Sequence, residues 1–244
     1  MSELLVAKNL CKDGILKDIN FIINEGEMVA VMGPSGSGKS TLLYQVSGMD
    51  CSDSGEVWMD GTEICALSED DRARLRLSKM GFVFQQMNML KNLNLIDNIM
   101  LPACQLKKGK SSRKEIEHRA QTLMQKMGIE KLERRKITEV SGGQLQRACI
   151  CRSMMNQPKI LFADEPTGAL NQSAAQGVME EFTRLNMENT TILMVTHDSK
   201  VAARCGRILY LLDGSIKGEL SLEKIPEEKE REERVKRWLA EMGW

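Results

Sequence analysis

A glycine-rich segment of the sequence has the residue types and spacing that suit the binding of phosphate groups. It reads Gly-Pro-Ser-Gly-Ser-Gly-Lys-Ser from position 33 to position 40 and matches the pattern G-x-x-x-x-G-K-S. Glycines leave room for backbone N–H groups to close around a phosphate. Lys39 would reach the β- and γ-phosphates of a nucleotide, and Ser40 would be a ligand of Mg²⁺. We expect the phosphates to contact Gly33, Pro34, Ser35, Gly36, Ser37, Gly38, Lys39, Ser40 and Thr41.

A second segment places two carboxylates at the end of an apolar run. Residues 160–163 read Ile-Leu-Phe-Ala and are followed by Asp164 and Glu165. Asp164 would bind Mg²⁺ directly or through water, and Glu165 would face the γ-phosphate and polarise an attacking water. Many strands run into acidic loops, so the value of this prediction depends on the phosphate loop at residues 33–40.

A third segment, Ser141-Gly142-Gly143-Gln144, combines small residues with a predicted helix start. We name residues 141–144 the signature segment. Its hydroxyl and its glycine N–H groups could bind phosphate oxygens at the amino end of the helix. On its own, the segment would more readily be interpreted as an ordinary turn that precedes a helix.

The surrounding pattern indicates the elements that hold these segments. The apolar run at 27–32 precedes the phosphate loop, and a helix is expected at 41–46. Asp-Gly pairs at 60–61 and 213–214 indicate hairpins. Further strands are expected at residues 4–7, 16–23, 56–59, 62–64, 160–163, 191–195 and 208–212.

The middle of the chain differs from both ends. From about residue 98 to residue 155 the pattern is helical and rich in charged residues, and the basic stretch at 107–114 is expected to be an exposed loop. Strands that alternate with helices on either side of this region predict an α/β core with a helical insertion.

These segments, in this order, resemble the ABC family of ATP-binding domains over nearly the whole chain. The phosphate loop corresponds to the Walker A motif, residues 160–165 correspond to Walker B, and the signature segment resembles L-S-G-G-Q with Val140 in the first position. The resemblance implies an α/β fold: a RecA-like P-loop NTPase core with an antiparallel β subdomain and an inserted α-helical subdomain. It also implies ATP hydrolysis with ATP and Mg²⁺ as cofactors.

The resemblance assigns further residues. Gln85, or its neighbour Gln86 if the register slips by one, resembles the Q-loop glutamine that touches Mg²⁺ or the attacking water. His197 resembles the switch histidine near the γ-phosphate. The implied catalytic residues are Glu165, His197 and Gln85. The implied Mg²⁺ ligands are Ser40, Gln85 and Asp164, and the implied second-chain contacts to ATP are Ser141, Gly142, Gly143 and Gln144.

Two positions depart from the family pattern. Residues 168–171 resemble the D-loop, but Asn171 stands where aspartate is usual. Residues 11–15 contain no aromatic side chain, although the family commonly stacks one on adenine there. We therefore expect weak discrimination between nucleotide bases.

The resemblance also implies partners. Two copies would pair head to tail, with ATP between Lys39 of one copy and Ser141 of the other, and a separately encoded transmembrane permease would be driven. Residues 81–85 and 163–170 resemble a subgroup of macrolide exporters, lipoprotein-release ATPases and bacitracin-type peptide-resistance transporters, with a leaning towards peptide resistance. The alternative is a regulatory ATPase that controls envelope signalling or cell-wall hydrolases without transport.

The permease is expected to insert a short helix near residues 85–100, and the alternative is that this stretch is core of the helical insertion. The expected contacts are Met87, Met89, Leu90 and Leu93. Residues 1–222 are expected to form the ATP-binding domain, with the helical subdomain at approximately 86–155. Residues 223–244 are expected to form a charged amphipathic helix that docks on the core or, alternatively, binds a partner.

Bulk composition is consistent with these expectations. Among 244 residues, 34 are basic and 34 are acidic, so a general attraction to nucleic acid is not indicated. The seven cysteines lack C-x-x-C spacing and are expected to be buried thiols in a reducing compartment. No secretory signal and no transmembrane segment are expected, so the chain would be held at the cytoplasmic side of the cell membrane by its partner.

Overall fold

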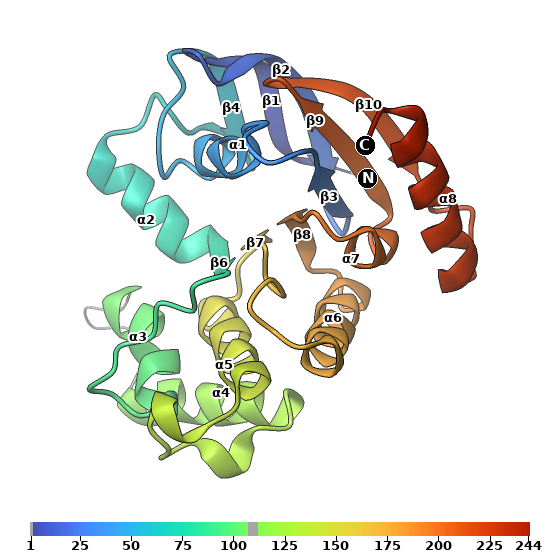
Figure 1. Cartoon of the computed structure of the whole chain (residues 1–244). Helices are drawn as coiled ribbons and strands as arrows, with labels where there is room; N and C mark the ends of the chain where they lie inside the picture. Colours follow the sequence, from blue (N-terminus) through green and yellow to red (C-terminus); the bar gives the residue numbers. More distant parts are fainter. Residues whose placement is uncertain (1, 107–111) are drawn as a thin grey trace.

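The computed structural model describes residues 2–106 and 112–244 (Figure 1). It contains two β-sheets, with helices packed around them, and it confirms the predicted α/β fold class. Most of the predicted basic loop at 107–114 lies outside the described residues. The loop prediction is wrong for its last two residues. Residues 113 and 114 belong to a helix whose amino end is capped by Ser112 and Glu115.

The larger sheet has six strands in the order β10-β9-β3-β8-β7-β6. The strands from β9 to β6 pair in parallel, and only β10 is antiparallel to its neighbour. Parallel strands bring their carboxyl ends to one edge, which is where ligands bind in open α/β sheets. Their bounds are β3 (Met28–Met32), β6 (Met80–Phe84), β7 (Ile160–Asp164), β8 (Thr191–Val195), β9 (Arg207–Leu212) and β10 (Ser215–Ser221).

The smaller sheet is antiparallel and has the order β2-β1-β4-β5. Its β4–β5 hairpin turns at Asp60 and Gly61, which have φ values of 50° and 73°. Positive φ at both central residues is the geometry that an Asp-Gly pair predicts. The bounds are β1 (Glu3–Lys12), β2 (Leu16–Asn24), β4 (Ser54–Met59) and β5 (Thr62–Glu63). One apolar core joins this sheet to one face of the larger sheet and to α1 (Lys39–Val46).

A second core joins the other face of the larger sheet to the helical region. The helical region begins at Leu95, three residues before the expected start. Asn98 is fully buried there and its amide donates hydrogen bonds to the carbonyls of Leu90, Leu93 and Asn94. The elements of this part are α3 (Leu95–Leu106), α4 (Arg113–Lys126), α5 (Gly142–Met154), α6 (Gln172–Met187), and the short 3-10 helices Glu130–Leu132 and Ile137–Glu139.

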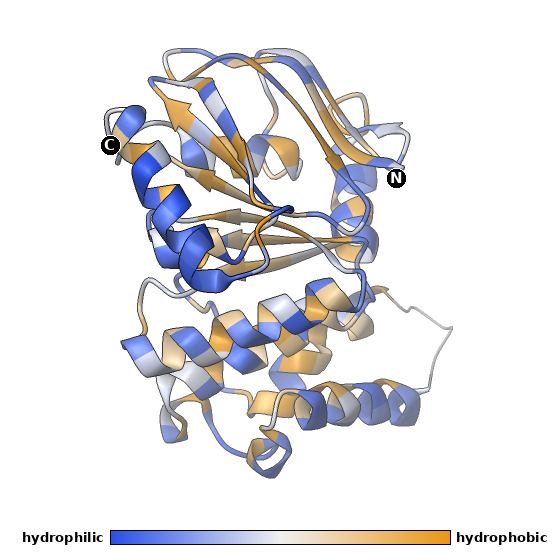
Figure 2. Ribbon diagram, turned by 90° about the vertical axis from the view of Figure 1, so that its right-hand side faces the viewer, coloured by the Kyte–Doolittle hydropathy of each residue, from blue (hydrophilic) through white to orange (hydrophobic). Residues whose placement is uncertain are grey.

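Three helices complete the described chain: α2 (Glu69–Lys79), α7 (Ser199–Ala203) and α8 (Glu228–Glu241). Helix α8 lies alongside β10 and α7, and buries Val235, Trp238 and Leu239 (Figure 1). Its outer side is hydrophilic, whereas the strands of the larger sheet are mostly hydrophobic (Figure 2). None of the described helices is long and apolar enough to cross a membrane.

The cysteines correct one expectation. Cys149, Cys151 and Cys205 are buried, and burial raises the pKa of each thiol. The other four are not buried: Cys104 is exposed, and partial exposure is found for Cys11, Cys51 and Cys65. The prediction of seven buried thiols is therefore wrong for these four, because an apolar neighbourhood in sequence does not determine which side chains face inward.

Candidate active site

The phosphate loop connects the fully buried strand β3 to α1. Two of its glycines are required by the structure. A Cβ atom at Gly33 would lie 2.0 Å from the carbonyl oxygen of Leu211. Gly38 caps α1 with a φ of 100°, which side-chain-bearing residues rarely adopt. The loop therefore keeps its backbone close to the sheet and its N–H groups at the amino end of a helix, where an anion is favoured.

Lys39 lies across this loop. Its Nζ donates hydrogen bonds to the carbonyl oxygens of Gly33 and Pro34, both at 2.8 Å. Burial lowers the pKa of Lys39, while the charges of Glu165 and Asp164 act in the opposite direction. A bound phosphate would supply the counter-charge that this partly desolvated ammonium group lacks. The hydroxyl of Ser37 is buried without a hydrogen-bond partner, so it is also available to an incoming acceptor.

Ser40 and Asp164 form the second part of the site. The Ser40 hydroxyl donates to Oδ1 of Asp164 at 3.1 Å, which joins the start of α1 to the end of β7. Burial raises the pKa of Asp164, and the hydrogen bond from Ser40 opposes that shift. A hydroxyl beside a desolvated carboxylate is a pair of oxygen ligands that suits Mg²⁺. Among the described residues, no group of three or more His, Cys, Asp or Glu side chains is arranged to hold a metal ion.

Glu165 and His197 meet at the ends of the neighbouring strands β7 and β8. Oε1 of Glu165 lies 2.9 Å from Nδ1 of His197. The backbone of Glu165 turns sharply, with a φ of 46°, and its N–H donates to the carbonyl of Val195 at 3.0 Å. The turn takes the chain out of the sheet immediately after Asp164, so one carboxylate faces the Ser40 hydroxyl and the next faces the imidazole.

Gln85 is placed differently from the expectation that it touches Mg²⁺. It follows β6, and a Cβ atom added at Gly168 would lie 2.9 Å from its Nε2. Its side chain therefore lies against the segment that follows Glu165, and its described contacts do not include Ser40 or Asp164. The structure brings Gln85 to the neighbourhood of the site through Gly168.

Gln146 is a positioning residue that the sequence analysis did not identify. Its side chain is buried, and its amide donates to the carbonyl of Pro166 at 2.8 Å. It thereby connects α5 to the residue that follows Glu165. The sequence could have identified Gln146 from its place on the apolar face of α5. A buried amide on such a face requires a hydrogen-bond partner.

The signature segment forms the amino end of α5. The Ser141 hydroxyl accepts a hydrogen bond from the N–H of Gln144, and the Gln144 side chain accepts one from the N–H of Ser141. Gly142 and Gly143 pack closely, since Cβ atoms there would approach Leu170 and Ala174 at 3.3 and 3.0 Å. Ser141 and Gly142 are exposed, and no described contact joins the signature segment to the phosphate loop.

Asn171, which replaces the usual aspartate, caps α6. Its Oδ1 accepts a hydrogen bond from the N–H of Ala174 at 2.9 Å. An asparagine serves this role about as well as an aspartate. The substitution therefore removes a negative charge beside the signature segment without disturbing the start of the helix.

Fold and site together define a P-loop nucleoside triphosphatase. A parallel sheet carries a phosphate loop, a hydroxyl–carboxylate pair and a carboxylate–imidazole pair at one edge. A cavity of about 610 Å³ adjoins this edge, lined by Glu165, Thr167, His197, Lys200 and Arg204 among others.

Comparison with known proteins identifies the family. The ABC transporter family matches residues 16–168. The chain is 42% identical to the lipoprotein-releasing system ATP-binding protein LolD 1 of Chlorobium chlorochromatii, over 83% of this chain and 82% of that protein. It is 43% identical to the macrolide export ATP-binding/permease protein MacB of Neisseria meningitidis serogroup B over 87% of this chain, but it spans only 32% of that protein.

A solved structure is also similar. The dimeric ATP-binding cassette MJ0796, in a post-hydrolysis state bound to ADP and Pi, superposes with a TM-score of 0.82 at 37% identity, covering 90% of this chain and 99% of that one. The chain belongs to the ABC transporter family, and it is an ABC-type ATPase that uses ATP and Mg²⁺. The predicted resemblance to the macrolide-exporter and lipoprotein-release subgroup is confirmed.

Proposed function

We propose that this chain hydrolyses ATP to drive a separate transmembrane permease that exports or releases a peptide, lipid or lipoprotein-type substrate. The observation that supports the proposal most is the set of contacts at the carboxyl edge of the larger sheet. Lys39, Ser40 and Asp164 are arranged for a nucleotide with Mg²⁺, and Glu165 with His197 for activating water.

Each residue then has a chemical role. Residues 33–41 hold the phosphates through backbone N–H groups and Lys39. Ser40 and Asp164 would supply oxygens to Mg²⁺, which would neutralise charge on the phosphates when bound. Gln85, whose side chain lies against Gly168, would sense the nucleotide through the segment that follows Glu165. Glu165 accepts a proton from the attacking water, and His197, 2.9 Å away, fixes the orientation of that carboxylate and steadies the γ-phosphate.

The signature segment acts in a second copy of the chain. The exposed Ser141 and Gly142 lie without contact to the phosphate loop of their own chain, as described above, and the similar cassette MJ0796 is dimeric. In a head-to-tail dimer, the hydroxyl and N–H groups at the start of α5 would complete the phosphate shell of the other copy. ATP would then hold the two copies together, and hydrolysis would release them.

The permease contact is proposed at a groove beside β6. This groove has a volume of about 330 Å³ and its lining includes Met49, Leu77, Phe82, Phe84 and Pro102, from the loop after α1, from α2, β6 and α3. The contacts expected from the sequence lie outside this groove. Met89 is buried in the core, and none of Met87, Met89, Leu90 and Leu93 lines the groove.

The organisation of the chain follows from these roles. Residues 1–222 would form the ATP-binding domain, with residues 86–155 as its inserted helical subdomain. Residues 223–244 would add the charged helix, which lies on the core. Attachment through the groove would place the chain at the cytoplasmic side of the cell membrane as a peripheral subunit.

A matched pair of substitutions tests the proposal. Met49→Glu puts a charge in the proposed groove, whereas Met187→Glu puts the same charge on a side chain that is 82% exposed at the end of α6. We expect Met49→Glu to abolish copurification of the permease, and Met187→Glu to retain it. Both variants should keep the ATP affinity of the isolated chain. Permease capture that survives Met49→Glu would place the contact elsewhere.

Reconstitution separates transport from regulation. The complex of this chain and its copurified permease is placed in liposomes with ATP, and movement of peptide or lipid across the bilayer is measured. ATP-dependent flux that Glu165→Gln abolishes would support transport. ATP hydrolysis without flux of either class would favour the regulatory alternative.

A further inference from the structure

The cavity of about 610 Å³ at the carboxyl edge of the larger sheet has one wall formed by α8. Glu228 and Glu232, from the first half of α8, line this cavity together with Glu165 and His197. Arg204, the residue at which α7 ends, lines it as well. Helix α8 therefore shares a cavity with the two residues to which we assign the activation of water.

The imidazole of His197 depends on the backbone that carries it. Its side chain is 66% exposed, and its described hydrogen bond is the one with Glu165. Packing against neighbouring side chains therefore fixes it much less than it would fix a buried ring. The next residue, Asp198, caps α7 by accepting a hydrogen bond from the N–H of Lys200 at 2.8 Å. The placement of α7 thus sets the placement of His197.

Helix α7 is in turn held by α8. It has only five residues, too few for a helix that is stable without tertiary contacts. Residues 201–203 are buried, and the helix packs against α8 (Figure 1). At the end of α7, a guanidinium nitrogen of Arg204 lies 2.8 Å from Oε1 of Glu228. The Arg204 side chain is only 18% exposed, so this ion pair is partly shielded from water.

Helix α8 is itself anchored to the larger sheet. Val235, Trp238 and Leu239 are buried, and the ring of Trp238 meets that of Tyr210 in β9 edge to face, with centroids 6.1 Å apart. A Cβ atom added at Gly218 in β10 would lie 3.2 Å from the same indole, so the helix lies close against this strand. These contacts give α7 a partner that is fixed independently of the phosphate loop.

We propose that Arg204 and Glu228 are positioning residues for ATP hydrolysis. Their ion pair holds α7 against α8 and so keeps the backbone of His197 where the imidazole meets Glu165. The inference rests on the proposed role of His197 in hydrolysis, and it gives α8 a role in turnover beyond docking on the core. Nucleotide affinity should not depend on the pair, because β3 and α1 carry the phosphate loop.

Reversal of charge tests the pair more sharply than its removal, because Glu228 is 62% exposed and exposed ion pairs contribute little stability. Glu228→Arg opposes two guanidinium groups, and Arg204→Glu opposes two carboxylates. We expect kcat to fall roughly 10-fold in each variant, since a small displacement of a catalytic group is costly, while ATP affinity changes by less than about twofold. The double variant Arg204→Glu/Glu228→Arg exchanges the charges and should recover most of the lost turnover.

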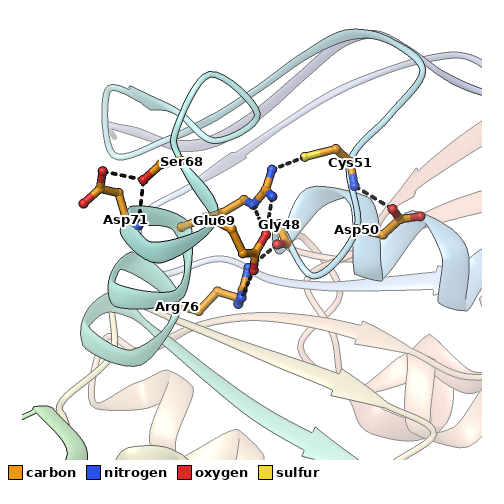
Figure 3. A network of polar contacts seen from close by, with 8 residues as sticks. Gly48, Asp50, Cys51, Ser68, Glu69, Asp71 and Arg76 are labelled. Carbon is orange, nitrogen blue, oxygen red and sulfur yellow. Dashed lines mark hydrogen bonds and ion pairs between the residues drawn. The ribbon is translucent and has the colours of Figure 1, made fainter.

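Two controls separate positioning from stability. Glu230→Arg makes the same reversal on the first turn of α8, at an exposed residue that does not line the cavity, so kcat should not change. Glu69→Gln weakens a network at the start of α2, where Glu69 accepts hydrogen bonds from Arg72 and Arg76, and Arg72 also donates to Sγ of Cys51 (Figure 3). It should lower the melting temperature and leave kcat within about twofold of the wild type.

The measurements use the full-length chain, in complex with the permease where the isolated chain does not turn over ATP. Phosphate release gives kcat per nucleotide-binding site, ATP titration gives the affinity, and the melting temperature reports stability. His197→Ala is measured in parallel. A wild-type kcat in His197→Ala would show that the proposed role of the histidine is wrong, and the inference would fall with it.

The inference can also fail alone. If His197→Ala lowers kcat but Glu228→Arg does not, or if the exchanged pair does not recover turnover, the role of His197 stands and the role of the ion pair is overturned. A loss of kcat in Glu69→Gln that matches its loss of stability would reduce the pair to a structural contact. Glu228→Arg changes an exposed side chain, so it is informative even if Arg204→Glu does not fold.

Discussion

The phosphate loop and the signature segment differ in how complete they are within one chain. At the phosphate loop, Lys39 already donates hydrogen bonds to two carbonyl groups, and Ser40 already donates one to Asp164. At the signature segment, the described hydrogen bonds of the exposed Ser141 stay within its own helix, with Gln144 and Leu145. The first region is assembled by the fold of a single chain, whereas the second is built as a helix start that faces outward. In the proposed head-to-tail dimer, one chain would prepare the reaction and another copy would complete it.

The largest effect is expected when the proposed proton acceptor, Glu165, is removed. Glu165→Gln keeps the size of the side chain but not its basicity, so turnover should fall by roughly 10²–10⁴ while ATP binding persists. Steady-state phosphate release and ATP titration measure the two quantities. The variant should accumulate as an ATP-bound dimer in size-exclusion chromatography, in the presence of the permease if the isolated chain does not dimerise.

Glu181→Gln is the matched control for that experiment. Its side chain is 15% exposed against 17% for Glu165, and it pairs with Arg184 in α6, away from the phosphate loop. Turnover of this variant should stay within about twofold of the wild type. A wild-type rate in Glu165→Gln would show that the base has been assigned to the wrong residue.

A second substitution removes the positive charge of the phosphate loop. Lys39→Ala deletes a hydrogen bond to a charged group, which contributes about 1.5–3 kcal/mol, so ATP affinity should fall roughly 10- to 100-fold and the ATP-bound dimer should not form. Fluorescence titration with a labelled nucleotide measures the affinity. Lys159→Ala, which removes a lysine paired with Asp60, should leave it unchanged. Equal losses in both variants would indicate general destabilisation.

The third substitution acts on the outward-facing region alone. Ser141→Ala should leave ATP affinity of the isolated chain unchanged and weaken the ATP-dependent dimer roughly 10- to 100-fold, since a hydrogen bond to a charged phosphate contributes about 1.5–3 kcal/mol. Ser112→Ala is an unusually close control, because Ser112 caps α4 through the same reciprocal pair of hydrogen bonds, with Glu115. A similar dimer defect in both variants would reduce the role of Ser141 to helix capping.

The smallest expected effect concerns recognition of the nucleotide base. No aromatic side chain is available in residues 11–15, and a stacked ring would contribute roughly 1–3 kcal/mol. ATP and GTP should therefore bind with affinities that agree within about tenfold in parallel titrations. A stronger preference for ATP would show that another side chain reads adenine.

The sequence predicted most of what surrounds the phosphate loop, because local pattern and tertiary structure agree there. The apolar run before Gly33 is a fully buried strand, as expected. The Asp-Gly pair at position 60 turns the hairpin through positive φ at both residues. In these segments, glycine spacing and uninterrupted apolar runs are compatible with few other local structures.

Other features required the structure. Helix α2 buries only Leu75, so its sequence has no apolar stripe to predict it. The contact between Gln85 and Gly168 joins residues that are far apart in the chain, and no spacing rule fixes such a pair. The four cysteines that are not buried were mispredicted for a similar reason. Periodicity indicates a face, but only packing determines which thiol sits beside an arginine.

The backbone turn at Glu165 has a consequence for protein engineering. A non-glycine residue with a φ of 46° carries a conformational penalty of roughly 1–2 kcal/mol relative to the right-handed region, and glycine would avoid it. Glu165→Gly should therefore raise the melting temperature and abolish ATP hydrolysis together. A library of variants selected for heat resistance alone would be drawn towards glycine at this position, and the most durable survivors would be inactive.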